Sequence, residues 1–112
     1  MADAGDVVWL EFPGADKTKQ RPAIVLSSDE YHGSRPDVIV GLVTSQIAKA
    51  KTATDRVLAD WSSAGLRKPS AFRTFLATVP KASVISTMGR LSVADWEAVQ
   101  DCVARAIKLS RH

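Results

Sequence analysis

The chain has 112 residues, a length that suits one domain with a modest core. Apolar residues make up 46% of it and charged residues 24%, as in ordinary soluble globular proteins. Its longest apolar runs, such as residues 38–43, are far shorter than the roughly 20 residues that span a bilayer. The acidic N-terminus lacks the apolar segment of a signal peptide, and the single cysteine, Cys102, cannot form an internal disulfide. We therefore expect a cytoplasmic protein with no membrane partner.

Charge is unevenly distributed along the chain. Residues 1–37 hold seven acids and four bases, whereas residues 38–94 hold two acids and eight bases. These eight bases are Lys49, Lys51, Arg56, Arg67, Lys68, Arg73, Lys81 and Arg90. If they converge on one face, that face attracts polyanions such as nucleic acid. A solvated basic surface without a partner is the alternative that charge alone leaves open.

Short strand-like segments fill most of residues 1–90. Residues 7–12 combine β-branched and aromatic side chains and end at the turn pair Pro13-Gly14. Residues 37–44 form a continuous apolar run, which predicts a strand buried on both faces. Polar loops are expected at 15–20 and 28–36, and one helical turn closed by Gly65. Strands are predicted at 7–12, 21–27, 37–44, 56–60, 83–88 and, with a polar break at Arg73 and Thr74, at 70–79.

One helix is predicted near the C-terminus. Ser92 followed by Asp95 resembles a capping box. Apolar residues then recur at spacings of three and four, at Trp96, Val99, Val103 and Ile107. The helix is expected to run from about 93 to about 108.

Five or six short strands with no helices between them cannot form a doubly wound sheet. They predict a mainly β protein, a small and strongly bent antiparallel sheet or barrel closed by the last helix. We expect one domain over residues 1–112, with the barrel at about 5–91 and the helix at about 93–108.

The most informative motif places an arginine at the start of one strand and a hydroxyl at the end of another. Arg21 and Pro22 precede one apolar run, and Thr44, Ser45 and Gln46 follow the next. If the two strands pair antiparallel, the guanidinium of Arg21 and the hydroxyl of Thr44 come together. Such a pair can hold a phosphate, because a guanidinium matches phosphate oxygens bidentately.

These residues also have purely structural interpretations. Arg21 can pair with Glu11 or Asp37 across strands, and Thr44 can bond to the local backbone. His32 is expected to be a solvated loop residue, although its loop could approach a groove. The three tryptophans are expected in core or dimer contacts rather than as platforms for bases.

No metal or cofactor site is indicated. One cysteine and two histidines provide no ligand spacing, and no acids cluster in sequence. A glycine-rich phosphate loop and a Ser-His-Asp arrangement are also missing from the sequence. We therefore expect no cofactor.

Four segments, in order, resemble the MazF/PemK-type toxins. They are Gly-Asp-Val-Val-Trp-Leu-Glu-Phe (5–12), Arg-Pro-Ala-Ile-Val-Leu-Ser (21–27), Val-Thr-Ser-Gln (43–46) and Met-Gly-Arg-Leu-Ser (88–92). The resemblance covers about 5–107. It implies an SH3-like barrel with a C-terminal helix, usually a homodimer. It further implies a metal-independent endonuclease of single-stranded RNA, and a cognate antitoxin whose disordered tail fills the RNA groove.

The resemblance places the active-site pair on Arg21 and Thr44. Some members carry an Arg-x-Asp in the later strand that aids acid–base work. Here the arginine is Arg73 but Phe75 stands at the aspartate position, so we expect the activity to be weakened. Four residues are expected to bind the substrate: Lys19, Ser45, Gln46 and Arg73.

Two functions follow from these features. The first is a toxin endoribonuclease that cleaves mRNA through attack of the 2′-hydroxyl, stabilised by Arg21 and Thr44. The alternative is a non-catalytic barrel module that binds RNA, or a protein target such as gyrase. The gyrase version ranks lower, because the C-terminal sequence does not resemble that of the gyrase-poisoning toxins of this barrel type.

Overall fold

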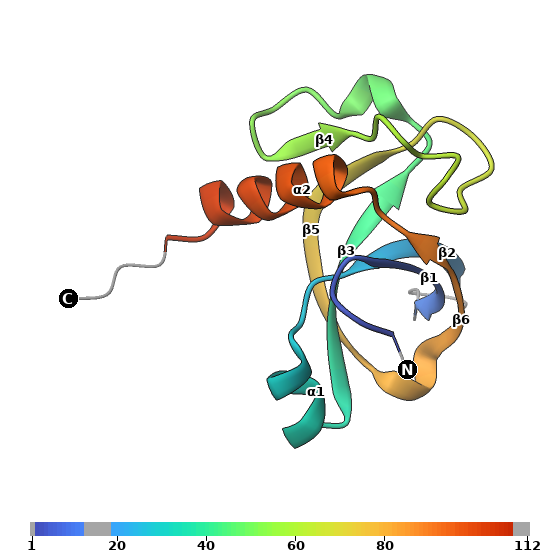
Figure 1. Cartoon of the computed structure of the whole chain (residues 1–112), viewed down its shortest axis with the longest axis vertical. Helices are drawn as coiled ribbons and strands as arrows, with labels where there is room; N and C mark the ends of the chain where they lie inside the picture. The colour runs from blue at the N-terminus through green and yellow to red at the C-terminus, as the bar shows by residue number, and fades with distance from the viewer. Residues whose placement is uncertain (1, 13–18, 109–112) are drawn as a thin grey trace.

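The computed structural model describes residues 2–12 and 19–108. Within them, strands dominate and two α-helices flank the sheet (Figure 1). The elements in chain order are β1 (Asp6–Phe12), β2 (Lys19–Val25), α1 (Asp29–Ser34), β3 (Asp37–Thr44), the 3-10 helix η1 (Ile47–Lys49), β4 (Asp55–Val57), β5 (Ala71–Pro80), the 3-10 helix η2 (Lys81–Ser83), β6 (Val84–Arg90) and α2 (Val93–Ala106).

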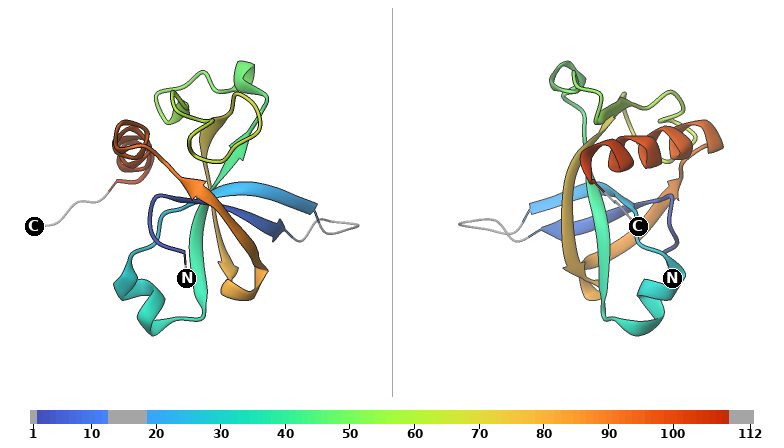
Figure 2. Two further views of the ribbon diagram at one scale, coloured as in Figure 1. Left: turned by 45° about the vertical axis from the view of Figure 1, so that its right-hand side comes forward. Right: turned by 90° about the vertical axis from the view of Figure 1, so that its left-hand side faces the viewer.

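All six strands belong to one antiparallel sheet of order β4-β5-β3-β2-β1-β6. β5 and β6 are joined by the three residues of η2, yet three other strands lie between them in the sheet. A flat sheet would hold them about 19 Å apart, whereas this connection reaches at most about 14 Å. The sheet must therefore curl back on itself, as Figure 2 shows.

The predicted fold class is confirmed as a mainly β, six-stranded antiparallel sheet with a C-terminal helix. The edge strands β4 and β6 do not pair with each other in the part of the chain that the structure describes. The predicted SH3-like barrel is thus a strongly bent sheet that stays open along one seam.

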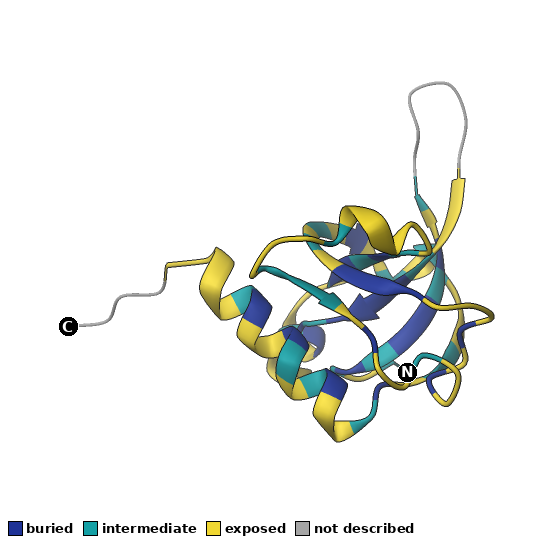
Figure 3. Cartoon of the chain, turned by 90° about the horizontal axis from the view of Figure 1, so that it is seen from above, coloured by how far each residue is buried: buried dark blue, intermediate teal, exposed yellow. Residues whose placement is uncertain are grey.

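Two apolar clusters pack on opposite faces of the central strands. Neighbouring residues of β1 show the division, because Val7 belongs to one cluster and Val8 to the other. The first cluster joins the sheet to α2 through Val99 and Cys102, and it includes Phe72. The second is built from strand residues alone. Figure 3 shows buried positions interspersed with exposed ones along α2.

The helix and the strands follow the sequence predictions closely. The hydroxyl of Ser92 accepts a hydrogen bond from Asp95 N–H at 3.2 Å and caps α2. The helix ends at Ala106, two residues before the predicted end. β3 has the predicted bounds, and none of its residues is exposed. Gly65 closes the expected helical turn with a φ of 90°.

Two predicted loops are wrong. Residues 28–36 were expected to be irregular, but α1 forms there because Ser28 Oγ accepts from Tyr31 N–H at 3.3 Å and acids occupy its first turn. Lys19 and Gln20 were expected in a loop, but they extend β2 by pairing with β1. The turn at Pro13-Gly14 and the rest of that loop lie outside the described residues. No helix in the described residues is long and apolar enough to cross a bilayer.

Candidate active site

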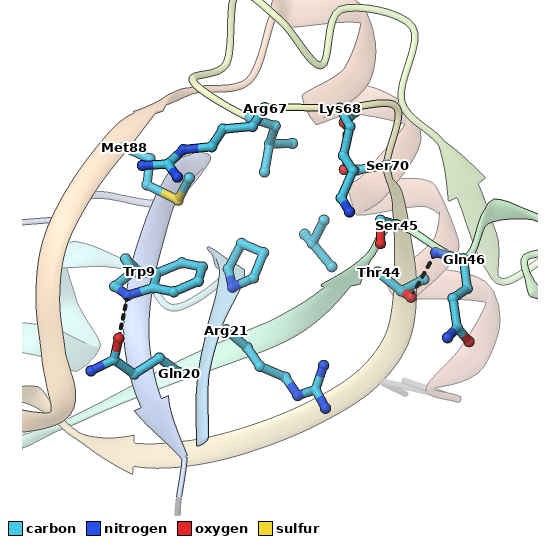
Figure 4. A pocket seen from close by; sticks show the side chains of 13 residues that line it. Trp9, Gln20, Arg21, Thr44, Ser45, Gln46, Arg67, Lys68, Ser70 and Met88 are labelled. Carbon is cyan, nitrogen blue, oxygen red and sulfur yellow. Dashed lines mark hydrogen bonds between the residues drawn. The ribbon is translucent and has the colours of Figure 1, made fainter. Parts of the chain in front are cut away.

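A pocket of about 610 Å³ opens where β2 begins and β3 ends (Figure 4). Its lining comes from the ends of these two strands, from β1 and β6, and from the segment between β4 and β5. Each of these parts provides a different kind of surface.

Pro22 explains why the pocket opens at this point. Leu26, the residue after the end of β2, donates its N–H to Ile39 O of β3 at 2.9 Å. Alternate residues of a strand direct their backbone groups to the same neighbour, so Pro22 also faces β3, opposite Val43. Proline has no N–H to donate. The pairing of β2 with β3 therefore includes Ala23 but does not reach Pro22. Pro22 and Val43 both line the pocket that begins there.

The same register, continued by one residue, sets Arg21 opposite Thr44. Both line the pocket, with Arg21 exposed and Thr44 half-buried. Arg21 has no carboxylate partner among the described residues, so the predicted alternative of a cross-strand ion pair is not seen. Asp37 instead accepts from Arg35 at 3.3 Å. The two predicted catalytic residues therefore share one open site.

The hydroxyl of Thr44 is held by the local backbone. Its Oγ1 accepts a hydrogen bond from Gln46 N–H at 3.1 Å, drawn in Figure 4. This contact uses a lone pair of the oxygen and leaves the hydroxyl proton free to donate to a ligand. Ser45 and Gln46 line the pocket as well.

The floor of the pocket is apolar and partly aromatic. Trp9 Nε1 donates to Gln20 Oε1 at 3.0 Å, which fixes the indole ring. Pro22, Leu66 and Met88 complete this surface. Trp9 was expected in the core or in a dimer contact, and its half-buried indole lines the pocket. A fixed indole offers a flat ligand a stacking face.

The far wall carries two cations that were not predicted as site residues. Arg67 and Lys68 line the pocket opposite Arg21, and Figure 4 shows the ammonium of Lys68 directed inward. The available signal was their place in the basic middle of the chain, directly after Gly65. Only the fold could show which of those eight bases meet.

The structure does not bring Lys19 or Arg73 into the lining. Arg73 lies in a bulge of β5, where the register on β3 jumps between Gly41 and Val43. Its Nε lies 3.8 Å from Asp55 Oδ1, an ion pair that ties β5 to β4.

Phe75 is 62% exposed on the same bulge and also lies outside the lining. The side chain at position 75 therefore does not enter the pocket.

His32 occupies a different region from the one considered for it. It is buried on α1, not solvated, and its Nε2 lies 2.5 Å from Ser27 Oγ. Ser27 Oγ in turn accepts from Ile39 N–H at 3.0 Å. Through Ser27, His32 links α1 to β3, and it lines a second, smaller pocket rather than the one at Arg21.

The electrostatics of the main pocket are one-sided. Arg21, Arg67 and Lys68 line it, and no aspartate or glutamate of the described residues does. Within the same residues, no three His, Cys, Asp or Glu side chains gather as metal ligands would. The site is suited to anions with flat apolar groups attached.

Comparison with known proteins identifies the family. The chain belongs to the PemK-like, MazF-like toxins of type II toxin-antitoxin systems, whose family model matches residues 3–107. This agrees with the resemblance found in the four sequence segments. No curated protein matches the chain.

Solved structures share the fold at low sequence identity. A mycobacterial endoribonuclease in complex with its cognate antitoxin is 14% identical, covers 100% of both chains and has a TM-score of 0.80. MazF of Deinococcus radiodurans, from a MazE–MazF crystal structure, is 22% identical over 97% of this chain and 98% of that one, with a TM-score of 0.78. The toxin MazF-mt6 of Mycobacterium tuberculosis is 19% identical over 95% and 99%, with a TM-score of 0.74.

Proposed function

We propose that this protein is a toxin and an endoribonuclease, which cleaves single-stranded RNA, including mRNA, at internal phosphodiester bonds. The observation that carries the proposal is that Arg21 and Thr44 line one open pocket to which the described residues contribute no acid. The family supports it, and two of the similar structures are described as endoribonucleases.

The reaction is a transfer of the phosphodiester within the substrate. The 2′-oxygen of a ribose attacks the adjacent phosphorus and loses its proton, the bond from phosphorus to the 5′-oxygen breaks, and the 5′-oxygen gains a proton. The products are a 2′,3′-cyclic phosphate and a 5′-hydroxyl. Negative charge grows on the phosphate oxygens in the transition state, where the donors of Arg21 and the hydroxyl of Thr44 stabilise it.

The described lining supplies charge and donors rather than a proton acceptor. It contains no histidine, cysteine, aspartate or glutamate, and arginine stays protonated. Arg21 is therefore assigned an electrostatic role and not that of a general base. Metal independence, and the weakening expected from Phe75, remain predictions.

Partners follow from the same site. The mycobacterial structure is described as a complex with a cognate antitoxin, and the Deinococcus radiodurans structure as MazE–MazF. We propose that a cognate antitoxin neutralises this protein by filling the cationic pocket. We also propose that the protein is a symmetric homodimer and acts in the cytoplasm.

A binding module without catalysis is the second candidate. The lack of a proton acceptor in the described lining favours it, because a pocket with three cations can hold RNA without cutting it. The version that targets a protein such as gyrase has no support from the site.

Cleavage assays separate the two candidates. Purified protein is incubated in EDTA with single-stranded RNA, beside Arg21→Ala and, as a control, Arg105→Ala, whose side chain pairs with Asp101 on α2. We expect cutting by the parent and the control and little by Arg21→Ala. A 2′-deoxy substitution at the cut site should abolish cutting but preserve binding. Binding without products from any RNA would instead establish the second candidate, and undiminished cutting by Arg21→Ala would refute the assigned role.

A further inference from the structure

The arginines of the described residues fall into two groups. Five form ion pairs with aspartates: Arg35, Arg56, Arg73, Arg90 and Arg105. The other two, Arg21 and Arg67, have no carboxylate partner within residues 2–12 and 19–108, and both line the main pocket. Among the described residues, the arginines outside the main pocket are paired with aspartates, whereas the two arginines that line it are not.

The pocket holds more positive charge than one phosphate can match. Arg21, Arg67 and Lys68 together provide three charges, and no described acid in the lining offsets them. A phosphodiester carries one negative charge. A ligand that satisfies the site therefore brings several phosphates, as an internal stretch of RNA does and a single nucleotide monophosphate does not.

The cations stand on opposite sides of the apolar floor. Figure 4 shows Arg21 on one side of the pocket and Arg67 and Lys68 across from it, with the guanidinium of Arg67 on the side of Met88 and the ammonium of Lys68 on the side of Ser45. A chain that crosses the pocket passes both walls in succession. A phosphate held by Arg21 and Thr44 therefore has a neighbour along the strand near Arg67 and Lys68.

The wall that carries Arg67 and Lys68 is firmly supported. Leu66 is buried in the core, and the hydroxyl of Ser70 donates to the Lys68 carbonyl at 2.8 Å. Gly65 packs against the backbone of β6 so closely that a Cβ there would lie 2.2 Å from Met88 O. Cations on such a segment are positioned before the ligand arrives, which lowers the cost of binding.

We propose that Arg67 and Lys68 bind a phosphate that flanks the one being cleaved. This inference rests on the proposed endoribonuclease function and divides the pocket into two parts. Arg21 and Thr44 act on the reacting phosphate, whereas Arg67 and Lys68 position the strand beside it. The site therefore takes RNA with at least two consecutive phosphates.

The first test separates binding from chemistry. In the variant Arg67→Gln/Lys68→Gln the apolar stems remain and two charges are lost. We expect KM to rise roughly tenfold or more, with kcat within a few-fold of the parent. The slope of log KM against log salt should fall by about 0.7, the value for one phosphate contact on a single strand. The charge-matched control Arg35→Ala/Arg105→Ala, outside the pocket, should change neither quantity.

The second test locates the phosphate. Methylphosphonates, which are neutral, replace the phosphates beside the cut site one at a time. At one flanking position the methylphosphonate should raise KM for the parent. The same substrate should raise KM no further for Arg67→Gln/Lys68→Gln, because that variant already lacks the charges that bind this phosphate. The inference would be overturned if the methylphosphonate at every position raised KM by the same factor in the parent and in the double variant. An unchanged KM in the double variant with ordinary RNA would also overturn it.

The two proposals fail differently. If the parent does not cut RNA, the endoribonuclease proposal fails, and affinity for a 2′-deoxy strand then replaces KM as the measure of the flanking contact. If the parent cuts and Arg21→Ala does not, but the double variant behaves as the parent does, only the flanking-phosphate contact is refuted.

Discussion

Arg56 and Asp95 join β4 to the start of α2. Arg56 Nε and Nη2 lie 3.2 and 3.0 Å from Asp95 Oδ1, and the carboxylate also accepts from the backbone N–H groups of Ala59 and Asp60. Asp95 is completely buried, so four donors satisfy a charge that water cannot reach. The contact fixes the beginning of the segment that later carries Arg67.

Loss of this buried charge should destabilise the fold. Asp95→Asn removes the partner of Arg56 and leaves backbone donors poorly matched, so we expect the free energy of unfolding to fall by about 3 kcal/mol. Urea unfolding monitored by tryptophan fluorescence measures the change. Asp101→Asn, at an exposed carboxylate on the same helix, should cost less than about 1 kcal/mol. Equal effects of the two variants would contradict the role given to Asp95.

Acid should weaken the fold through the same group. Burial raises the pKa of Asp95, but hydrogen bonds from Ala59, Asp60 and Arg56 outweigh it and hold the pKa below the ordinary value of 3.8. A carboxyl whose pKa is lower in the folded state stabilises fully above its unfolded pKa and loses that contribution as pH falls through the folded value. We expect the free energy of unfolding of the parent to fall below about pH 4 more steeply than that of Asp95→Asn. Parallel pH profiles would contradict this.

The hydroxyl of Thr44 should matter more than its methyl group. Thr44→Val keeps the shape and removes the donor, so we expect kcat to fall about 10²-fold. Thr44→Ser keeps the hydroxyl and should retain most of the activity. Single-turnover cleavage of a short RNA compares them, with thermal unfolding as the check on folding. A valine variant as active as the serine variant would remove Thr44 from the mechanism.

Two glycines should respond in opposite directions to alanine. A Cβ on Gly41 would lie 2.2 Å from Phe72 Cε1, so Gly41→Ala should cost about 1–3 kcal/mol through overpacking. Gly33 lies exposed on α1 with no atom near its Cβ position. Gly33→Ala should stabilise by roughly 0.5–1 kcal/mol, because alanine favours helix. Chemical unfolding of both variants tests the packing of β3 on β5.

The protein should sediment as a dimer. Large apolar side chains remain exposed on the described surface, among them Phe75 and Ile85 at 62% and 50%. At micromolar concentration we expect a species of twice 12.1 kDa. A single 12.1 kDa species across that range would argue against a homodimer.

Much of the fold could be predicted from local patterns. Ser92 and the apolar spacing after it define α2, and the apolar run of β3 gave its bounds correctly. Arg21 and Thr44 were brought together by one assumption, that two strands pair antiparallel. That assumption holds because the order of short strands, without helices between them, leaves few other arrangements.

The remaining site residues depend on contacts between distant segments. Arg67 and Lys68 reach the pocket because the segment before β5 folds over β6, a contact set by Gly65 and Met88 that no local pattern encodes. Arg73 also belongs to the basic middle of the chain, but it forms an ion pair with Asp55 and does not line the pocket. His32 was misplaced because its burial follows from its contact with Ser27, in the connection between β2 and α1.

The missing amide of Pro22 has a consequence for how this protein can vary. Most other residues at that position would provide an N–H donor toward Val43. The pairing of β2 with β3 could then continue past Ala23 toward the start of β2. The sheet would gain a hydrogen bond while the cleft beside Arg21 narrowed. Selection for stability alone would therefore tend to close this cleft. A proline at this position gives up one hydrogen bond between β2 and β3 and keeps the guanidinium of Arg21 accessible.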